Sequence, residues 1–98
     1  MFEVVAEPAR RGILDLLLQG PRPVGELVTE TGLSQPNTSR HLRVLRDAGL
    51  VESRAEGQRR LYRLRPAGLA EIERWLAPYR QLWRRSLADL ERHLDEEE

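Results

Sequence analysis

The amino-acid sequence predicts a mainly α-helical domain with one small β-hairpin after its middle. Apolar residues recur at helical spacing over most of the chain, and glycine and proline separate the helical stretches. Between residues 51 and 65 the pattern changes to the two-residue period of strands. The chain has 98 residues, which suits one domain or one subunit of a small oligomer. Because a core of this size is modest, dimerisation would add useful burial.

The N-terminal third predicts two helices that follow a short apolar turn over residues 1–6. Proline favours the first helical position, so one helix begins at Pro8, and Gly20 and the proline after it end that helix. A second helix begins at Pro23 and stops at Gly32.

The third long helix, over residues 35–48, has clear boundaries. Ser34 is a favourable N-cap, Pro36 fits the first turn, and Gly49 can end the helix. Two short helices joined by a glycine-containing turn are typical of a helix-turn-helix. This organisation predicts that the third helix is the one that enters a DNA groove.

Helix 35–48 has an apolar side and a basic side. On a helical wheel, Thr38, Leu42 and Leu45 cluster together, and His41 lies at the edge of that cluster. We expect His41 either to pack at this boundary or to donate a hydrogen bond to a phosphate. The opposite side carries the residues predicted to face DNA: Gln35, Pro36, Ser39, Arg40, Arg43 and Arg46. The alternative is a solvated arginine face on an ordinary surface helix.

Specific contacts follow from the residue types on the polar side. Gln35 and Arg40 can form paired hydrogen bonds with adenine and guanine, respectively. Ser39 is short enough to permit close approach. Arg43 and Arg46 are placed for phosphates, together with the free amides at the start of the helix.

Residues 51–65 predict a two-stranded hairpin with an arginine-rich tip around residues 56–58. Arg59 and Arg60 follow the tip, where arginine can enter a minor groove or bind the DNA backbone. The alternative is an exposed strand that its charge protects against aggregation. We expect Tyr62 to pack under the hairpin rather than to stack on a base. The predicted order is α-α-α-α-β-β-α, a winged helix-turn-helix.

Residues 66–98 predict a long C-terminal helix, which follows a DNA-binding core over residues 8–65. Leu69, Trp75 and Leu82 widen a seam close to a heptad repeat, and Pro78 predicts a kink or a break into two helices. The seam consists of Ile72, Leu76, Tyr79, Trp83, Leu87, Leu90 and Leu94.

The charge of the chain is unevenly distributed although its net charge is zero. Residues 34–65 carry eight arginines and three acids, whereas residues 95–98 are all acidic. All sixteen basic residues are arginine, which binds phosphates and guanine edges bidentately. A basic middle region is what a DNA-binding surface requires.

Several classes of protein are disfavoured by what the sequence lacks. There is no cysteine, glycine-rich phosphate loop or convincing pair of nucleophile and base, so we expect neither an enzyme nor a cofactor. No apolar run reaches the ~18 residues that span a membrane, and the N-terminus does not resemble a signal peptide. We therefore expect a cytoplasmic protein, associated with the nucleoid when bound to DNA. Asp89 and His93, with Glu96 or Glu97, could bind zinc across a dimer; the preferred alternative is a charged helix end without a metal.

These segments together resemble the ArsR/SmtB family of winged-helix transcription regulators. "AEPARRGILDLL" is similar to the family's opening helix, and "LSQPNTSRHLRVLRDAGLVESRAEGQRRLYRL" to its recognition helix and wing. The resemblance covers nearly the whole chain. It implies a homodimer that binds a partly palindromic operator and usually represses. It also supports Gln35, Pro36, Ser39 and Arg40 as groove-facing residues, with Arg59 at the wing.

The C-terminal segment "WLAPYRQLWRRSLADLERHL" is similar to a metal-independent branch of that family. Metal-sensing members place cysteines near the recognition helix, or Asp and His ligands on the final helix. The resemblance implies a packing role, in the core or a dimer, for the aromatic residues; with two leucines of the seam they form our predicted dimerisation set: Trp75, Tyr79, Trp83, Leu87 and Leu90. An intrachain helical hairpin is the alternative.

The sequence leaves the inducing signal, the operator and the choice between repression and activation open. A second reading of the fold is a protein-interaction module, because winged helices also serve that purpose. In such modules the recognition helix usually lacks a basic face. This helix keeps one, which favours DNA as the partner.

Overall fold

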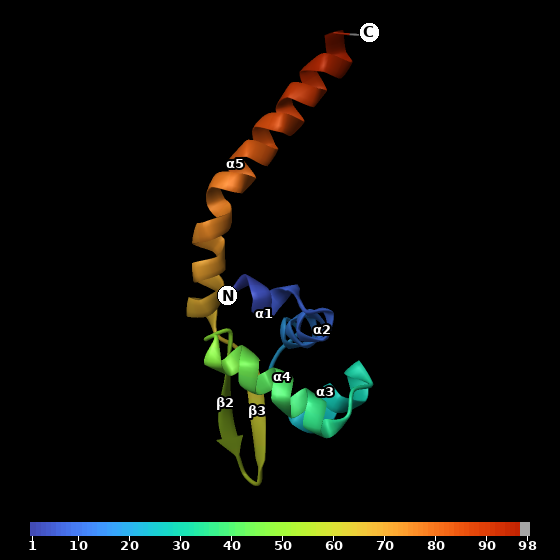
Figure 1. Cartoon of the computed structure of the whole chain (residues 1–98), viewed down its shortest axis with the longest axis vertical. Helices are drawn as coiled ribbons and strands as arrows, with labels where there is room; N and C mark the ends of the chain where they lie inside the picture. The colour runs from blue at the N-terminus through green and yellow to red at the C-terminus, as the bar shows by residue number, and fades with distance from the viewer. Residues whose placement is uncertain (97–98) are drawn as a thin grey trace.

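The computed structural model describes residues 1–96, which form five helices and three strands (Figure 1). Glu97 and Glu98, the end of the acidic tail, lie outside the described residues. In chain order the elements are α1 (Phe2–Ala6), α2 (Pro8–Leu17), β1 (Arg22–Pro23), α3 (Val24–Thr31), α4 (Gln35–Asp47), β2 (Val51–Glu56), β3 (Arg59–Leu64) and α5 (Pro66–Glu96). The first seven elements gather at one end of the molecule, and α5 extends away from them.

The helix-turn-helix is formed by α3 and α4, and its boundaries confirm the predicted ones to within a residue. Gly32 ends α3 with a φ of 72°, in the left-handed region that glycine enters at little cost. The Ser34 hydroxyl accepts a hydrogen bond from the Asn37 N–H at 3.2 Å, which caps α4. At the other end Ala48 is the C-cap, and Gly49 has a φ of 78°.

The sheet has three antiparallel strands in the order β1-β3-β2. The predicted hairpin is confirmed, with Val51 opposite Leu64 at its base. The prediction of only two strands is wrong, because Pro23 lies opposite Leu61 in a short third strand and also serves as the N-cap of α3. A proline can occupy an edge strand such as β1, where a missing N–H is tolerated.

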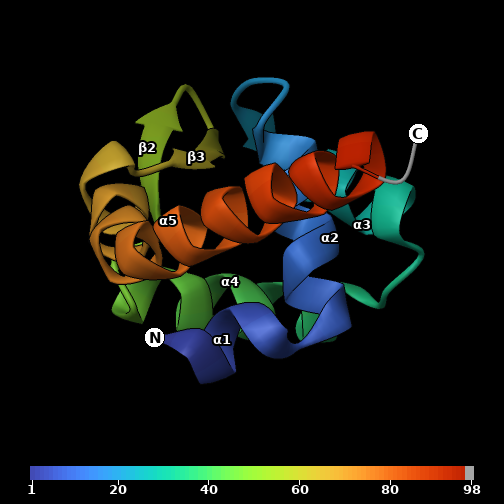
Figure 2. The same ribbon diagram turned by 90° about the horizontal axis from the view of Figure 1, so that it is seen from above.

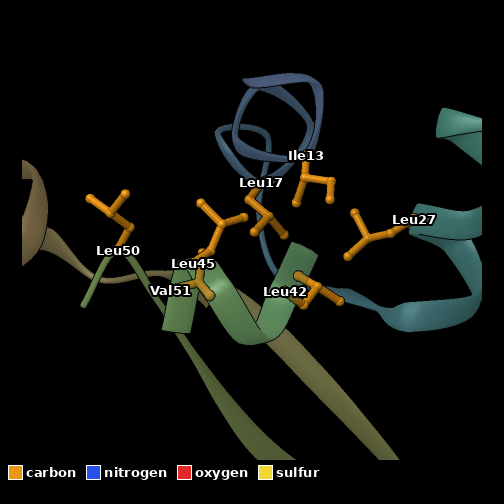
Figure 3. Packing of buried hydrophobic residues seen from close by; sticks show 7 residues of the cluster. All are labelled: Ile13, Leu17, Leu27, Leu42, Leu45, Leu50 and Val51. Carbon is orange, nitrogen blue, oxygen red and sulfur yellow. The ribbon is translucent and has the colours of Figure 1, made fainter. Parts of the chain in front are cut away.

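The core lies between α2, α3, α4 and the start of β2 (Figure 3). The predicted apolar side of α4 is confirmed as the buried side, since Thr38, Leu42 and Leu45 are at most 1% exposed. These side chains fix the rotation of α4 about its own axis. The buried apolar residues are Ile13, Leu17, Leu27, Leu42, Leu45, Leu50 and Val51.

The last element, α5, is a single helix of 31 residues that continues through Pro78. Figure 1 shows that it bends in its first half, as expected where a proline lacks its N–H and crowds the preceding turn. The predicted kink is therefore present, and the alternatives of a break and of an intrachain helical hairpin are wrong. Seen from above, α1 and the strands lie on either side of α5 (Figure 2).

The base of α5 rests directly on the end of α4. A Cβ atom at Gly68 would collide with the carbonyl group of Gly49, so only glycine permits this approach. The Arg65 N–H also donates to the Leu50 carbonyl at 2.9 Å. Main-chain contacts therefore connect the C-terminal end of α4 with the base of α5.

Candidate nucleic-acid interface

The polar side of α4 is exposed along its whole length. The buried apolar side faces α2 and α3, so the opposite side faces solvent. The structure brings together on this surface six of the residues that the sequence singled out: Gln35, Pro36, Ser39, Arg40, Arg43 and Arg46.

The guanidinium groups of this side are unpaired within the described residues. The side chains of Arg40, Arg43 and Arg46 form no hydrogen bond or ion pair with any residue between 1 and 96. Other arginines are paired: the Arg63 Nε, for example, lies 2.7 Å from a carboxylate oxygen of Glu52. The unpaired guanidinium groups on α4 keep all their donors for an external acceptor, and their geometry matches phosphates and guanine edges.

The first turn of α4 has fewer free amides than the sequence suggested. The Ser34 hydroxyl accepts a hydrogen bond from the Asn37 N–H, and the Ser34 carbonyl accepts one from the Thr38 N–H at 2.9 Å. Pro36 has no N–H, which leaves the Gln35 N–H as the first-turn amide without a partner in the described part of the chain. Any anion bound by backbone here would therefore contact Gln35.

His41 does not belong to this surface. Its side chain is only 10% exposed, and its Nδ1 lies 3.4 Å from the Arg10 Nη1 and 4.0 Å from a carboxylate oxygen of Glu7. Both partners belong to the start of α2. The structure therefore supports packing for His41, and its hydrogen bond to a phosphate stays a prediction. The edge position on the helical wheel could not show that α2 covers this ring.

Arg59 and Arg60 project from opposite faces of the hairpin, because successive residues of a strand alternate. The Arg60 Nη1 donates to the Ser53 hydroxyl at 3.0 Å. The Arg59 Nη2 lies 3.9 Å from a carboxylate oxygen of Glu56, and both of these side chains are more than half exposed. Such an exposed pair contributes little to stability, so Arg59 can exchange its partner at low cost.

Tyr62 shares the strand face of Arg60 and completes a hollow between β3 and α4. Its predicted packing is confirmed, since it is partly buried against the core. With Ser39, Arg43 and Arg46 it also lines a hollow of about 130 Å³. This position of Tyr62 beside α4 was not among the predictions from the sequence. The available signal was the alternation that places Tyr62 on the same face as Arg60.

The apolar side of α5 is the second exposed surface. Trp75 contacts Phe2 of α1 and Tyr79, with ring centroids 4.1 and 4.7 Å apart. Ile72 also packs against the core, and beyond these contacts most of the side is open to solvent. The five predicted dimerisation residues are between 41% and 64% exposed: Trp75, Tyr79, Trp83, Leu87 and Leu90.

The end of α5 shows no grouped metal ligands in its described part. Asp89 forms an ion pair with Arg92, and residues 1–96 contain no group of three or more His, Cys, Asp or Glu side chains placed to hold a metal. Glu97, one of the carboxylates considered for zinc, lies outside the described residues. None of the described helices is both long and apolar enough to cross a bilayer.

Several known proteins are similar to this chain in sequence and in fold. Residues 7–53 match the family described as bacterial regulatory protein, arsR family. The HTH-type transcriptional regulator Rv2034 of Mycobacterium tuberculosis is 38% identical over 96 residues, which cover 98% of this chain and 87% of the relative. The chain belongs to the arsR family of bacterial regulatory proteins. This class is one of transcriptional regulators and not of enzymes.

Two further arsR-family comparisons concern activity and assembly. The transcriptional repressor SdpR of Bacillus subtilis is 32% identical over 76 residues, covering 78% of this chain and 84% of that protein. The homodimeric winged helix-turn-helix DNA-binding domain Mb0332 of Mycobacterium bovis matches with a TM-score of 0.66 and 35% identity. That match covers 81% of this chain and 73% of the other. These relatives support the winged helix-turn-helix fold.

Proposed function

We propose that this arsR-family protein is a homodimeric repressor that binds a partly palindromic DNA operator. In this proposal α4 lies in the major groove and the hairpin of β2 and β3 acts as the wing. One observation supports the proposal above all others. The apolar side of α4 is buried in the core, and its other side presents Arg40, Arg43 and Arg46, whose side chains have no partner among residues 1–96.

The proposed role of each residue on the polar side of α4 follows from its distance from the N-terminal end of the helix. Gln35, Ser39 and Arg40 belong to its first half, which helix-turn-helix proteins direct at base edges. Arg40 can read guanine and Gln35 adenine through paired hydrogen bonds. Arg43 and Arg46 lie further along and bind phosphates, which positions the helix without reading sequence.

The wing contributes from both faces of its arginine-rich tip. Arg60 shares its face with Tyr62 and therefore with the hollow beside α4, so it continues the basic surface of that helix. Arg59 points the other way and reaches the backbone or the minor groove beyond. Pro36, exposed in the first turn of α4, contributes apolar contact beside Gln35.

Dimerisation and repression complete the proposal. The exposed apolar side of α5 is suited to a second copy of the chain, and the similar domain from Mycobacterium bovis is homodimeric. Two copies place two recognition helices on half-sites about one DNA turn, ~10 bp, apart or at a multiple of it. The similar Bacillus subtilis protein is a transcriptional repressor, and repression of this chain's target would follow from its occupancy of a promoter.

The decisive experiment is a titration of the purified protein into labelled DNA from its own promoter and into a scrambled duplex. Two salt concentrations are needed because phosphate contacts weaken as salt rises. We expect a preference of ~10³ or more for the promoter. Equal affinity for both duplexes would contradict sequence-specific binding to this promoter. Failure to bind either at low salt would instead favour the protein-interaction module.

The oligomeric state is tested separately by sedimentation velocity on the free protein and on its operator complex. We expect a dimer in both samples and one dimer per operator. A monomer at micromolar concentration that also binds DNA as a monomer would contradict the dimeric part of the proposal and leave the DNA-binding part standing.

A further inference from the structure

A cavity lies between α2 on one side and the C-terminal end of α3 with the turn that follows it on the other. Its volume is about 390 Å³, within the range of roughly 300–1,000 Å³ found for small-molecule sites. None of its lining residues comes from α5 or the strands. Figure 1 shows that α2 and this turn lie on the side of the domain away from the base of α5. The cavity is therefore separate from the exposed apolar side of α5.

The wall of the cavity combines apolar surface with two acidic side chains. Leu16 and Leu33 supply apolar surface from α2 and from the turn, and a Cβ at Gly12 would meet open space. The charged residues of the lining are Asp15 and Glu30, which lie at its solvent-exposed edge. Neither carboxylate has a hydrogen bond or ion pair within residues 1–96, and no arginine lines the cavity although the chain contains sixteen.

We propose that this cavity binds a small organic cation, an amine with an apolar body. Its ammonium group would lie between Asp15 and Glu30, where two carboxylates attract a positive charge and repel an anion. Its body would cover Leu16 and Leu33 and occupy the space over Gly12. Apolar walls with a few polar groups that fix orientation are the usual chemistry of small-molecule sites.

The position of the cavity gives such a ligand a connection to DNA binding. Leu33 directly precedes Ser34, the N-cap of α4, so a ligand here bridges α2 and the start of the recognition helix. A bound amine therefore changes the affinity for operator DNA. This consequence rests on the proposed function, whereas the binding site itself does not.

The site is tested without DNA by NMR titration of the full chain with phenethylamine. We expect shift changes in the backbone amides of Gly12, Leu16 and Leu33 and saturation at millimolar concentration. Phenylpropionate, of similar size and opposite charge, is the matched control and should leave these amides unchanged. Equal shifts with both compounds, or no shifts at these amides with phenethylamine, would overturn the proposal.

Two sets of variants locate the binding. Gly12→Leu adds a side chain at the cavity wall, where a Cβ meets nothing within 4 Å, and should weaken phenethylamine binding at least ~10-fold. Asp15→Asn combined with Glu30→Gln should weaken it by a similar factor, whereas Asp47→Asn, an exposed acid on α4, should not. Unchanged affinity in Gly12→Leu or in the double variant would place the amine elsewhere and refute the site.

The connection to DNA is tested by operator titration with and without phenethylamine. We expect a change in operator affinity for the native chain and none for Gly12→Leu. An unchanged affinity in the native chain would refute the regulatory consequence. If the native chain fails to bind DNA at all, the proposed function fails, and the NMR titration still decides the cavity independently.

Discussion

The helices α4 and α5 are both amphipathic, but α4 buries its apolar side in the core, whereas α5 leaves most of its described apolar side exposed. Leu42 and Leu45 of α4 are at most 1% exposed, whereas Trp83 and Leu90 of α5 are 64% and 53% exposed. The helix-turn-helix region therefore contains a complete hydrophobic core. The exposed apolar side of α5, by contrast, needs a second apolar surface to bury it.

The polar sides of the two helices differ in how many of their arginines are paired. On α5, Arg80 pairs with Glu73 and Arg92 pairs with Asp89, whereas the other three arginines of this helix have no side-chain partner within residues 1–96. On α4 none of the three arginines of the polar side has a side-chain partner within the same residues. Each helix thus leaves one surface for an external molecule: a basic one on α4 and an apolar one on α5.

The largest expected effect concerns the complete core. Leu45→Ala should lower the free energy of unfolding by about 2–5 kcal/mol, because it leaves a cavity at a fully buried position. Leu18→Ala is the matched control, since Leu18 is 71% exposed, and should change stability by no more than about 0.5 kcal/mol. Urea denaturation measures both variants. Similar losses of stability in the two variants would contradict the assignment of Leu45 to the core and of Leu18 to the surface.

The next effect concerns the exposed apolar side of α5. Trp83→Glu should raise the dissociation constant of the proposed dimer by ~100-fold or more, because a charge replaces an aromatic side chain of the proposed interface. Gln81→Glu adds the same charge on the opposite side of α5 and should leave the dimer intact. Sedimentation equilibrium compares them. The Trp83→Glu monomer should keep the NMR shifts of residues 8–65, and their collapse would contradict the independence of the core.

A smaller effect distinguishes base contacts on α4. Arg40→Ala should weaken operator binding by about 1–3 kcal/mol and relax the preference at one base pair. Binding to random DNA should change much less. Arg74→Ala, an exposed arginine on α5, is the control for loss of positive charge. Competition titrations with single-base operator variants measure the effect, and equal losses on operator and random DNA would refute the base-reading role.

The smallest effect concerns phosphate contacts. Arg43→Ala should weaken binding to all sequences alike and reduce the slope of log affinity against log salt by about one. Titrations at four or more salt concentrations give this slope. A slope equal to that of the native chain would argue against a phosphate contact for Arg43.

The sequence was sufficient where the physical cause was local. Ser34, Gly32 and Gly49 marked the ends of the helix-turn-helix, because capping depends on a few neighbouring residues. The apolar period of α4 likewise predicted its buried side. The exposed residues of the candidate interface followed from that side by exclusion.

The sequence was insufficient where distant segments meet. Strand β1 exists because Arg22 and Pro23 pair with β3, some forty residues later, and two residues carry no periodicity of their own. His41 lies among the start of α2, which a helical wheel of α4 cannot show. Pro78 bends α5 without breaking it, because the helix continues on both sides of the missing hydrogen bond.

The contact between Gly68 and Gly49 determines how motion passes between the two helices. A side chain at such a joint could absorb a small rotation by changing its rotamer, but two main-chain segments in contact cannot. Rotation of α5 is therefore transmitted directly to the C-terminal end of α4. The arrangement of α5 in an assembly therefore changes the angle at which the arginine side of α4 meets its ligand.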